Sequence, residues 1–285
     1  MACRYGANLR DPPRVRLAPD RGQVESTSFQ RTLVTYCPRS SPSTWSTMTP
    51  CIAILATGQM GASFGPLLAS AGVRLVTNLT GRSPRTCALA LEGGFEDLKT
   101  DSAILSHADV ILSVVVPSHA LALAERLAAA ASSASPIRTR FFADLNAISP
   151  TTASSISSNL TTALPHLRVV DGGIIGGPAS RSSSPLIVLS GSGAQELHEL
   201  LGPWLLSRTK VVGDTVGQAS AMKLAYASLS KGANALALNA AMMASRYGVG
   251  EALEEELGQS QPAMLKVMQG VPKSTAKVRL LRLGG

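Results

Sequence analysis

Short apolar runs alternate with longer segments rich in alanine and leucine from residue 50 to about residue 213. The apolar runs are rich in β-branched side chains, which is typical of buried strands. Strands are therefore expected at residues 52–55, 73–78, 110–116, 140–145, 168–171, 186–189 and 210–212. Helices are expected at residues 60–71, 95–107, 119–131, 150–160 and 193–201. This alternation predicts βαβ units and a mostly parallel sheet with helices on both faces.

The alternation stops after Gly213. Residues 216–247 contain no proline and only two glycines, and alanine, leucine and methionine dominate them. They predict one helix of about 30 residues that is buried over much of its surface. Shorter helices are expected at 251–257 and 263–269. The predicted fold class is α/β, with a doubly wound Rossmann sheet in residues 50–213, a smaller all-α domain in residues 214–270, and a ligand cleft between them.

The two ends of the chain differ in composition from the rest. Residues 1–49 are rich in arginine, proline, serine and threonine and lack apolar periodicity, which predicts a disordered extension. A mitochondrial transit peptide, or a true start of translation at Met48, are the alternatives for this segment. Residues 271–285 are predicted to form a basic tail.

The net charge of +8 comes from these ends. Residues 1–49 hold seven arginines and three acids, and residues 266–285 hold five basic residues and no acid. The other 14 basic and 15 acidic residues leave the predicted domains close to neutral, which argues against nucleic-acid binding.

The four cysteines show neither C-x-x-C spacing nor clustering with the four histidines, so no metal site or disulfide framework is expected. Reduced thiols fit the cytoplasm, with the mitochondrion as the alternative. No apolar run reaches the roughly 18 residues of a membrane span, so no membrane contact is expected. These observations leave a small-molecule partner as the expectation.

A glycine-rich turn follows the first predicted strand. Residues 56–61 read A-T-G-Q-M-G, which departs from the dinucleotide fingerprint G-x-G-x-x-G only at its first position. The second glycine of the fingerprint lets the backbone approach a diphosphate, and the third packs the helix against the strand. A small residue suffices at the first position. The residues predicted to bind a dinucleotide at this helix N-terminus are Ala56, Thr57, Gly58, Gln59, Met60 and Gly61.

The residues after the second predicted strand indicate which dinucleotide binds. NAD sites place an acid about 20 residues beyond the glycine turn to hold the ribose hydroxyls. No acid occurs between Met60 and Glu92, whereas Arg82 and Ser83 follow the strand. A guanidinium beside a hydroxyl suits a 2′-phosphate, so we predict NADP (NADPH) as the cofactor. Arg85 is an equal candidate for this contact, and a solvated Arg82 without a ligand is the alternative.

Two further stretches lie where predicted strands end, which is the edge at which α/β sheets bind ligands. In V-V-V-P-S-H, residues 114–119, we expect Val116 and Pro117 beside the cofactor. In D-L-N-A-I-S-P, residues 144–150, Asn146 offers an amide near the nicotinamide, and helix capping is the alternative role for the polar residues.

A third stretch, D-G-G-I-I-G-G-P at residues 171–178, has four glycines in six residues. Their unshielded amides suit a carboxylate or a phosphate. A tight turn or bulge without a ligand is an equal alternative.

Lys223 lies in the predicted long helix among alanine, methionine and leucine, and no acid follows it until Glu251. Apolar surroundings favour loss of the ammonium proton, as a general acid/base requires. A surface lysine that extends its amine into water is the alternative. Lys231 is the internal comparison, and the sequence alone does not separate the two.

In order and spacing, these stretches resemble the β-hydroxyacid dehydrogenase superfamily, which includes 6-phosphogluconate and 3-hydroxyisobutyrate dehydrogenases. The resemblance runs from about residue 52 to 277 and points to the branch with a phosphogluconate-dehydrogenase-like C-terminal domain. It implies hydride transfer between NADP and an alcohol carbon beside a carboxylate, with Lys223 as acid/base. It also implies that Asn146 lies near the cofactor and that Asp171, Gly176 and Gly177 bind substrate.

The sequence departs from the family pattern at three places. The family usually has Ser-Gly-Gly where this chain has Ile175 before its two glycines, and it usually has asparagine where Ala227 follows the lysine. Tyr226 or Asn234 are the candidates to replace that asparagine, and Tyr226 is predicted to bind substrate. Family members also continue with further helices, so the helical domain is expected to be truncated.

Three functional hypotheses follow. The first is an NADP-dependent oxidoreductase that acts on a small hydroxy acid or its keto or aldehyde partner. The second is imine reduction, which retention of the lysine disfavours. The third is an NADP-binding protein with little or no catalysis. A small helical domain opened by an apolar helix also predicts a homodimer.

Overall fold

A computed structural model of the protein describes residues 49–180, 183–202 and 208–274. Apart from its last residue, the predicted N-terminal extension lies outside these residues, and so do residues 275–285 of the predicted basic tail. None of the helices in the described ranges combines the length and the hydropathy that crossing a membrane requires.

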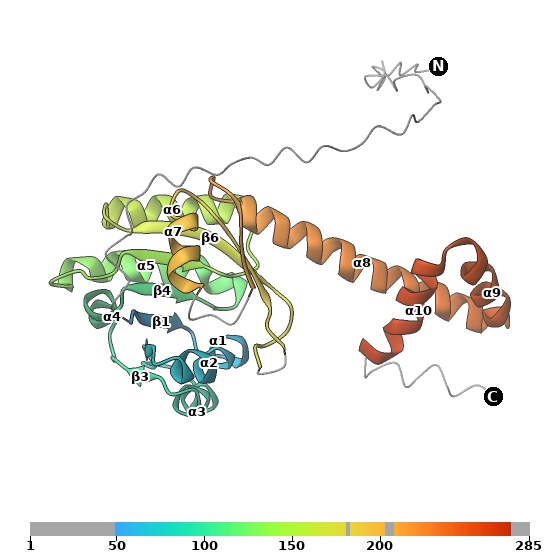
Figure 1. The fold of residues 1–285 in the computed structure, drawn as a ribbon, viewed down its shortest axis with the longest axis horizontal. Helices are drawn as coiled ribbons and strands as arrows, with labels where there is room; N and C mark the ends of the chain where they lie inside the picture. The colour runs from blue at the N-terminus through green and yellow to red at the C-terminus, as the bar shows by residue number, and fades with distance from the viewer. Residues whose placement is uncertain (1–48, 181–182, 203–207, 275–285) are drawn as a thin grey trace, which may run out of the picture. The chain divides into compact units, whose positions relative to one another are not determined.

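The strands in these ranges form one eight-stranded sheet in the order β3-β2-β1-β4-β5-β6-β7-β8 (Figure 1). Every neighbouring pair is parallel except β6 and β7, which are antiparallel. The bounds are β1 Cys51–Leu55, β2 Arg74–Thr77, β3 Glu96–Asp97, β4 Val110–Ser113, β5 Phe141–Asp144, β6 Arg168–Ile175, β7 Leu186–Ser190 and β8 Arg208–Gly213.

The helices are α1 Gln59–Ser63, α2 Gly65–Ser70, α3 Pro84–Glu92, α4 Asp101–His107, α5 Ala120–Ala130, α6 Pro150–Ala163, α7 Ala194–Leu201, α8 Gln218–Arg246, α9 Gly250–Ser260 and α10 Pro262–Ser274. The 3-10 turns η1 Pro117–His119 and η2 Ala131–Ser133 flank α5. These bounds match the predicted fold class, which is confirmed: a Rossmann sheet is followed by a helical segment that a long helix opens.

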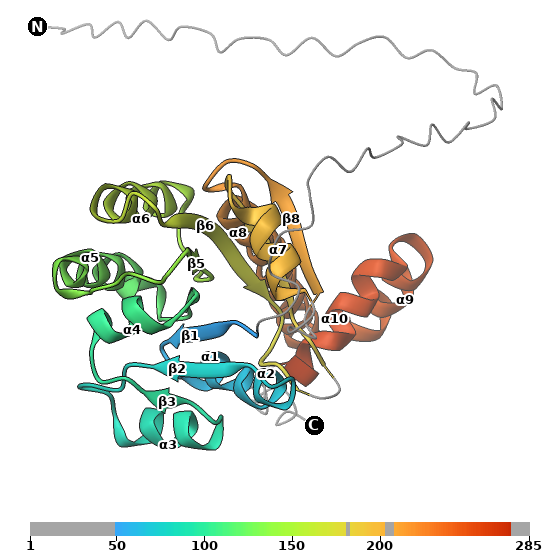
Figure 2. The same ribbon diagram turned by 60° about the vertical axis from the view of Figure 1, so that its left-hand side comes forward.

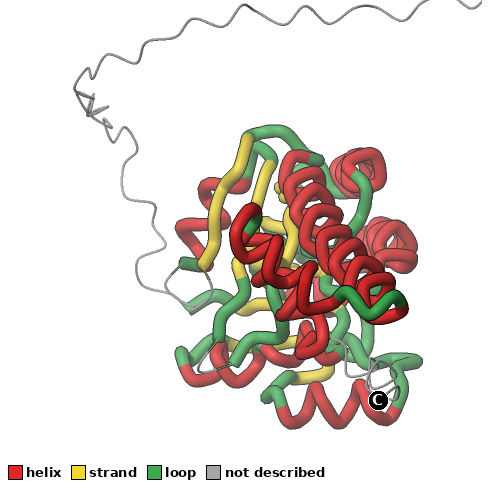
Figure 3. The backbone as a smooth tube through the Cα atoms, turned by 90° about the vertical axis from the view of Figure 1, so that its right-hand side faces the viewer, coloured by secondary structure: helices red, strands yellow, loops and turns green. Residues whose placement is uncertain are grey.

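Two apolar cores cover the two faces of the sheet, because successive side chains of a strand point to opposite faces. Ile52 and Ile54 of β1 pack with α1, α2, α3 and α7, whereas Ala53 and Leu55 pack with α4, α5 and α6. Figure 2 shows α4, α5 and α6 together on one side of the sheet, and Figure 3 shows helices on both sides of the strands. Burial on both faces explains why the predicted strands are continuous apolar runs.

Several predicted elements needed correction. The helix predicted at 60–71 is interrupted at Phe64, between α1 and α2. The helix predicted at 95–107 begins only at Asp101, where the Thr100 hydroxyl accepts a hydrogen bond from the amide of Ala103, and the short edge strand β3 precedes it. The helix α3 was not predicted, although its start at Ser83-Pro84 carries a serine cap and a proline.

The most consequential correction concerns the predicted glycine loop after Asp171. Residues up to Ile175 continue β6 and pair with β7, so most of the expected loop is strand. An added Cβ at Gly172 would lie 2.6 Å from the Leu145 side chain, and one at Gly173 would lie 3.0 Å from Cβ of Lys223. These glycines therefore permit close packing, whereas the prediction used them as exposed amides.

The predicted long helix is α8, with 29 residues. Its predicted burial over much of its surface is wrong for this chain, because only Ala219, Ser220, Ala237 and Ala244 in it are buried. Its first turns contact β6, β7 and β8, and α9 and α10 pack against its C-terminal half. The predicted limits of the two domains stay predictions. The arrangement places the first turns of α8 beside the carboxyl end of the sheet, where the glycine turn also lies.

Candidate functional site

A cavity of about 540 Å³ opens where the strand order reverses between β1 and β4. Ligands of open α/β sheets bind at this switch point, beyond the carboxyl ends of the strands. The lining residues come from the turns after β1, β2, β4 and β5, from β6 and from α8. They are Ala56, Gly58, Gln59, Met60, Gly61, Arg82, Thr86, Val114, Val115, Val116, Pro117, His119, Leu145, Asn146, Ala147, Ile174 and Lys223.

The glycine turn forms one wall of the cavity. An added Cβ at Gly61 would collide with the backbone oxygen of Ala56, so this glycine brings α1 close to the end of β1. At Gly58 a Cβ would meet nothing within 4 Å, so the space in front of this residue is open. Thr57 does not line the cavity, and its buried hydroxyl has no hydrogen-bond partner among the described residues. The turn therefore offers backbone to a ligand at Gly58.

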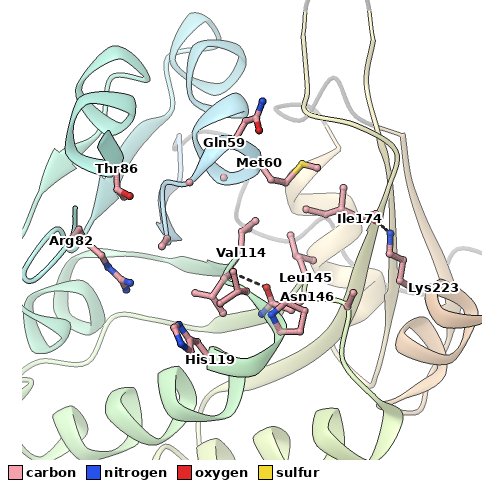
Figure 4. Close-up of a pocket in the computed structure, with 17 residues that line it drawn as sticks. Gln59, Met60, Arg82, Thr86, Val114, His119, Leu145, Asn146, Ile174 and Lys223 are labelled. Carbon is pink, nitrogen blue, oxygen red and sulfur yellow. Dashed lines mark hydrogen bonds between the residues drawn. The ribbon is translucent and has the colours of Figure 1, made fainter. Parts of the chain in front are cut away.

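A partly buried guanidinium lies at the end of the cavity nearest β2. Arg82 forms neither a side-chain hydrogen bond nor an ion pair within the part of the chain that the structure describes. Burial lowers the pKa of Arg82, and the nearby guanidinium of Arg126 lowers it further. Figure 4 shows Thr86, from the first turn of α3, on the same side of the cavity. Asp101 offsets part of this charge from a distance, and a cation without an ion-pair partner among the described residues favours an anionic ligand.

The residues predicted to contact the 2′-phosphate differ in whether they reach the cavity. Ser83 is exposed and does not line the cavity, because its hydroxyl caps α3 by accepting the amide hydrogen of Thr86 at 3.3 Å. Arg85 is exposed and also lies outside the lining residues. The structure thus brings Arg82 to the cavity and leaves Ser83 and Arg85 outside it. Sequence reasoning missed Thr86. The feature of the sequence that could have indicated it is the helix start at Pro84, which makes Thr86 the third residue of that helix.

Asn78 follows β2, in the region where an NAD site needs an acid. Its side-chain amide donates to Asp101 Oδ1 at 2.7 Å, and its Oδ1 accepts the amide hydrogen of Thr80 at 3.0 Å. Asp101 also forms an ion pair with Arg126. This network fixes the end of β2 without placing a free carboxylate beside Arg82.

The cavity floor comes from the ends of β4 and β5. Val116 and Pro117, which are predicted to contact the cofactor, line it, and His119 from η1 adds a residue that sequence reasoning missed. Asn146 lines it as well, but its side-chain amide donates to Ser113 Oγ at 2.8 Å and to Asp144 Oδ2 at 3.0 Å. Its Oδ1 accepts the amide hydrogen of Val115 at 2.7 Å. Asn146 therefore joins β4 to β5, and both of its donors are already used.

Asp144 is the buried carboxyl behind Asn146. Its Oδ1 accepts the backbone amide hydrogen of Asn146 at 2.9 Å. Burial raises the pKa of Asp144 to about 6, although the two hydrogen bonds from Asn146 oppose the rise. Asp171, its register partner on β6, adds to it by charge repulsion.

Lys223 lies at the other end of the cavity from Arg82 (Figure 4). Its amine donates a hydrogen bond to the backbone oxygen of Ile174 on β6. Burial lowers the pKa of Lys223, and Lys231 lowers it further by charge repulsion. Lys231 itself is exposed and does not line the cavity, so the structure separates the two lysines as the sequence did not.

Four residues predicted to bind substrate do not line the cavity. Asp171 is 1% exposed and its carboxylate is hydrogen-bonded within the protein. Gly176 and Gly177 follow β6 on the surface, and Tyr226 is 54% exposed on α8. Ile174 and Leu145 occupy the cavity wall near Lys223 instead. The sequence places Leu145 in a predicted strand and Ile174 in the glycine-rich stretch, and it singles out neither as a site residue.

Residues 51–217 match the family model of the NAD-binding domain of 6-phosphogluconate dehydrogenase. The chain belongs to this family. The predicted superfamily is confirmed, and membership makes the protein an oxidoreductase of the dehydrogenase and reductase class with a nicotinamide cofactor. The cavity fits such a cofactor by its volume, by the open space at Gly58 and by the cation of Arg82, which is unpaired among the residues that the structure describes.

Similar solved structures share this fold. The conserved protein MTH1747, whose structure was described as similar to 3-hydroxyacid dehydrogenases, is 28% identical, with a TM-score of 0.64 over 78% of this chain and 81% of that one. A conserved hypothetical protein from Sinorhizobium meliloti is also 28% identical, with a TM-score of 0.61 over 76% and 72%. The 3-hydroxyisobutyrate dehydrogenase of Mycobacterium tuberculosis, 19% identical with a TM-score of 0.61 over 75% and 72%, shares the fold. No curated protein matches the chain.

Asp144 gives a prediction about stability and pH. Its pKa is about 6 in the folded protein and 3.8 ordinarily, so between these values the folded protein binds a proton that the unfolded chain has released. Stability contributed by this group therefore falls as pH rises through that window, by up to about 3 kcal/mol. Asp144→Asn removes the effect. We expect the free energy of unfolding of the wild type, relative to this variant, to fall from pH 4 to 6 and to stay constant above pH 7 in urea titrations. A pH-independent difference would contradict the prediction.

Proposed function

We propose that the protein is an NADP(H)-dependent oxidoreductase that acts on a small hydroxy acid or its keto or aldehyde partner. The observation that carries the choice of cofactor is the partly buried guanidinium of Arg82, which lines the cavity without an ion-pair or side-chain hydrogen-bond partner among the described residues. A 2′-phosphate supplies two negative charges and oxygens for bidentate contact. Asn78, in the region of the ribose-binding acid of NAD sites, brings no charge that repels this phosphate.

The lining residues suggest how the cofactor would be held. Gly58 would bind the diphosphate through its backbone, because no side chain fills the space in front of it. Arg82 and Thr86 would bind the phosphorylated adenosine end. Residues 114–117 and Asn146 would then border the nicotinamide, with Asn146 acting as a clamp between β4 and β5.

The bound cofactor supplies or accepts the hydride. Lys223 would transfer the accompanying proton to or from the substrate oxygen, since burial lowers the pKa of its amine and so makes the proton easier to release. The backbone oxygen of Ile174 holds this amine in the cavity wall. Met60, Leu145 and Ile174 supply apolar surface nearby, so a small substrate with one polar group suits this end of the cavity (Figure 4).

We also propose that the protein is a homodimer that pairs through α8. At spacings of three and four residues along this helix lie Tyr226, Leu229, Ala233, Leu236, Ala240, Met243 and Tyr247. We call these residues the α8 seam. Its five large members are among the exposed hydrophobic side chains of the described residues. This spacing is that of a coiled-coil interface, and the two alanines allow close approach of a second helix.

The choice of cofactor is tested with Arg82→Glu. We expect at least a tenfold loss of NADPH affinity by calorimetry or nucleotide fluorescence, with NADH affinity changed by less than threefold, because a charge-assisted bond contributes about 1.5 to 3 kcal/mol. Arg85→Glu is the matched control, three residues away but outside the cavity, and is expected to bind both nucleotides as the wild type does. Unchanged affinity for both nucleotides in Arg82→Glu would place the phosphate elsewhere.

Catalysis is tested with Lys223→Met. Across a panel of small β-hydroxy acids, keto acids, aldehydes and cyclic imines, we expect a wild-type substrate whose kcat falls about 100-fold or more in the variant, with NADPH affinity within twofold. Lys231→Met, an exposed lysine on the same helix, is expected to keep kcat within threefold. NADPH binding without turnover anywhere in the panel would instead favour the binding protein with little catalysis. Turnover confined to imines would favour imine reduction.

The assembly is tested with Leu236→Glu in the middle of the α8 seam. Light scattering is expected to give twice the chain mass of 29.5 kDa for the wild type and the single mass for this variant. Leu91→Glu is the control, because Leu91 is 79% exposed on α3, outside the seam, and should leave the mass unchanged. A wild type that stays monomeric at micromolar concentration would refute the dimer.

A further inference from the structure

Asp171 is a buried carboxylate whose two oxygens are both occupied. Oδ2 accepts the backbone amide hydrogens of Gly217 and Ser220, each at 2.9 Å, and the hydroxyl hydrogen of Ser190 at 3.1 Å. Oδ1 accepts the hydroxyl hydrogen of Ser220 at 2.5 Å. Four hydrogen bonds from β7 and α8 thus meet on one side chain of β6.

These bonds complete the N-terminus of α8, which has no capping side chain of its own. The N-cap residue is Gly217, with φ 103°, and it offers no side chain to the free amides of the first turn. Asp171 takes the amides of Gly217 and Ser220, and Ser190 Oγ accepts the amide hydrogen of Ala219 at 2.9 Å. A carboxylate at this position also interacts favourably with the helix dipole.

Strand β6 also contacts Lys223, which lies about one helical turn beyond Ser220 in α8. Asp171 contacts α8 at Ser220, and Ile174, three residues along β6, accepts a hydrogen bond from the amine of Lys223. Between them, Gly173 leaves room for the Lys223 side chain, because an added Cβ there would lie 3.0 Å from Cβ of the lysine. Two points of contact, at Ser220 and at Lys223, therefore fix both the axial position and the rotation of α8 on β6.

We propose that Asp171 is a positioning residue that fixes the first turns of α8 on β6 and thereby holds the Lys223 amine in the cavity wall. The importance of this for catalysis rests on the proposed function of Lys223. Asp171 does not line the cavity, so it acts through the helix and does not touch the substrate. Asp171 is not among the groups that shift the pKa of Lys223 in either direction, which agrees with a mechanical role.

The test uses the full-length protein and the reactivity of the lysine amines toward trace acetic anhydride, measured by peptide mass spectrometry from pH 7 to 11 without nucleotide. In the wild type, the apparent pKa of Lys223 is expected below that of Lys231. In Asp171→Ala, we expect the apparent pKa of Lys223 to rise to that of Lys231. The labelling rate of its deprotonated amine should also rise at least fivefold, because the released helix exposes the side chain to water.

Asp109→Asn is the matched control. Asp109 is also buried, and it accepts the amide hydrogen of Cys51 and pairs with Arg138 before β4, away from the cavity. Its substitution is expected to leave the labelling of Lys223 unchanged. If Asp171→Ala does not fold, Asp171→Asn and Ser220→Ala are expected to change Lys223 in the same direction. Wild-type labelling of Lys223 in a folded Asp171 variant, or an equal change in Asp109→Asn, would overturn the proposal.

NADPH binding is measured separately on the same samples. A wild type that fails to bind NADPH would refute the proposed function, whereas the labelling experiment reads the anchoring of Lys223 without any nucleotide. With a substrate from the panel, Asp171→Ala is further expected to lower kcat at least tenfold with NADPH affinity within twofold. A loss of NADPH affinity with unchanged kcat would count against a positioning role.

Discussion

The parallel pairing of β1 with both β2 and β4 is the constraint on which the site depends. Because the connections from β1 and from β4 leave the sheet toward opposite faces, the two turns diverge and a crevice opens between them. The glycine turn and η1 line this crevice from its two sides, and the ends of β2 and β5 extend it in both directions. The cavity is thus a consequence of strand order, and its chemistry comes from the few side chains that reach it.

Those side chains give the two ends of the cavity different electrostatic environments. Within the described ranges, Arg82 at one end has no ion-pair or side-chain hydrogen-bond partner. The carboxylates nearby are used in fixed networks: Asp101 by Asn78 and Arg126, and Asp144 by Asn146. At the other end, Lys223 donates to a backbone oxygen among apolar neighbours. These buried acids therefore stabilise the structure, whereas the cations face the ligand. This arrangement suits a polyanionic cofactor beside a proton-transfer group.

The sequence predicted the elements with strong local signals. The apolar runs gave β1, β4 and β5 within a few residues, and the proline-free segment gave α8. It failed where tertiary contact overrides local pattern. The two-residue strand β3 is held by pairing with β2, and Gly172 and Gly173 are strand residues because Leu145 and Lys223 approach them closely. For the same reason the prediction that Asp171 binds substrate failed to foresee its internal role. Nothing in the local sequence shows that Asp171 accepts hydrogen bonds from the start of α8, more than 40 residues away.

Two of the three departures from the family pattern, at Ile175 and Ala227, gain a structural context from this arrangement. Ile175 is buried with Val188 and Ala219 under the start of α8, and Ala227 lies one turn beyond Lys223, outside the residues that line the cavity. An isoleucine at that place adds apolar contact between β6 and α8. The departures therefore affect the packing of α8 on β6 as much as the residues that a substrate contacts. A substrate at this end finds Lys223 and an apolar wall, which favours recognition by one polar group and by shape.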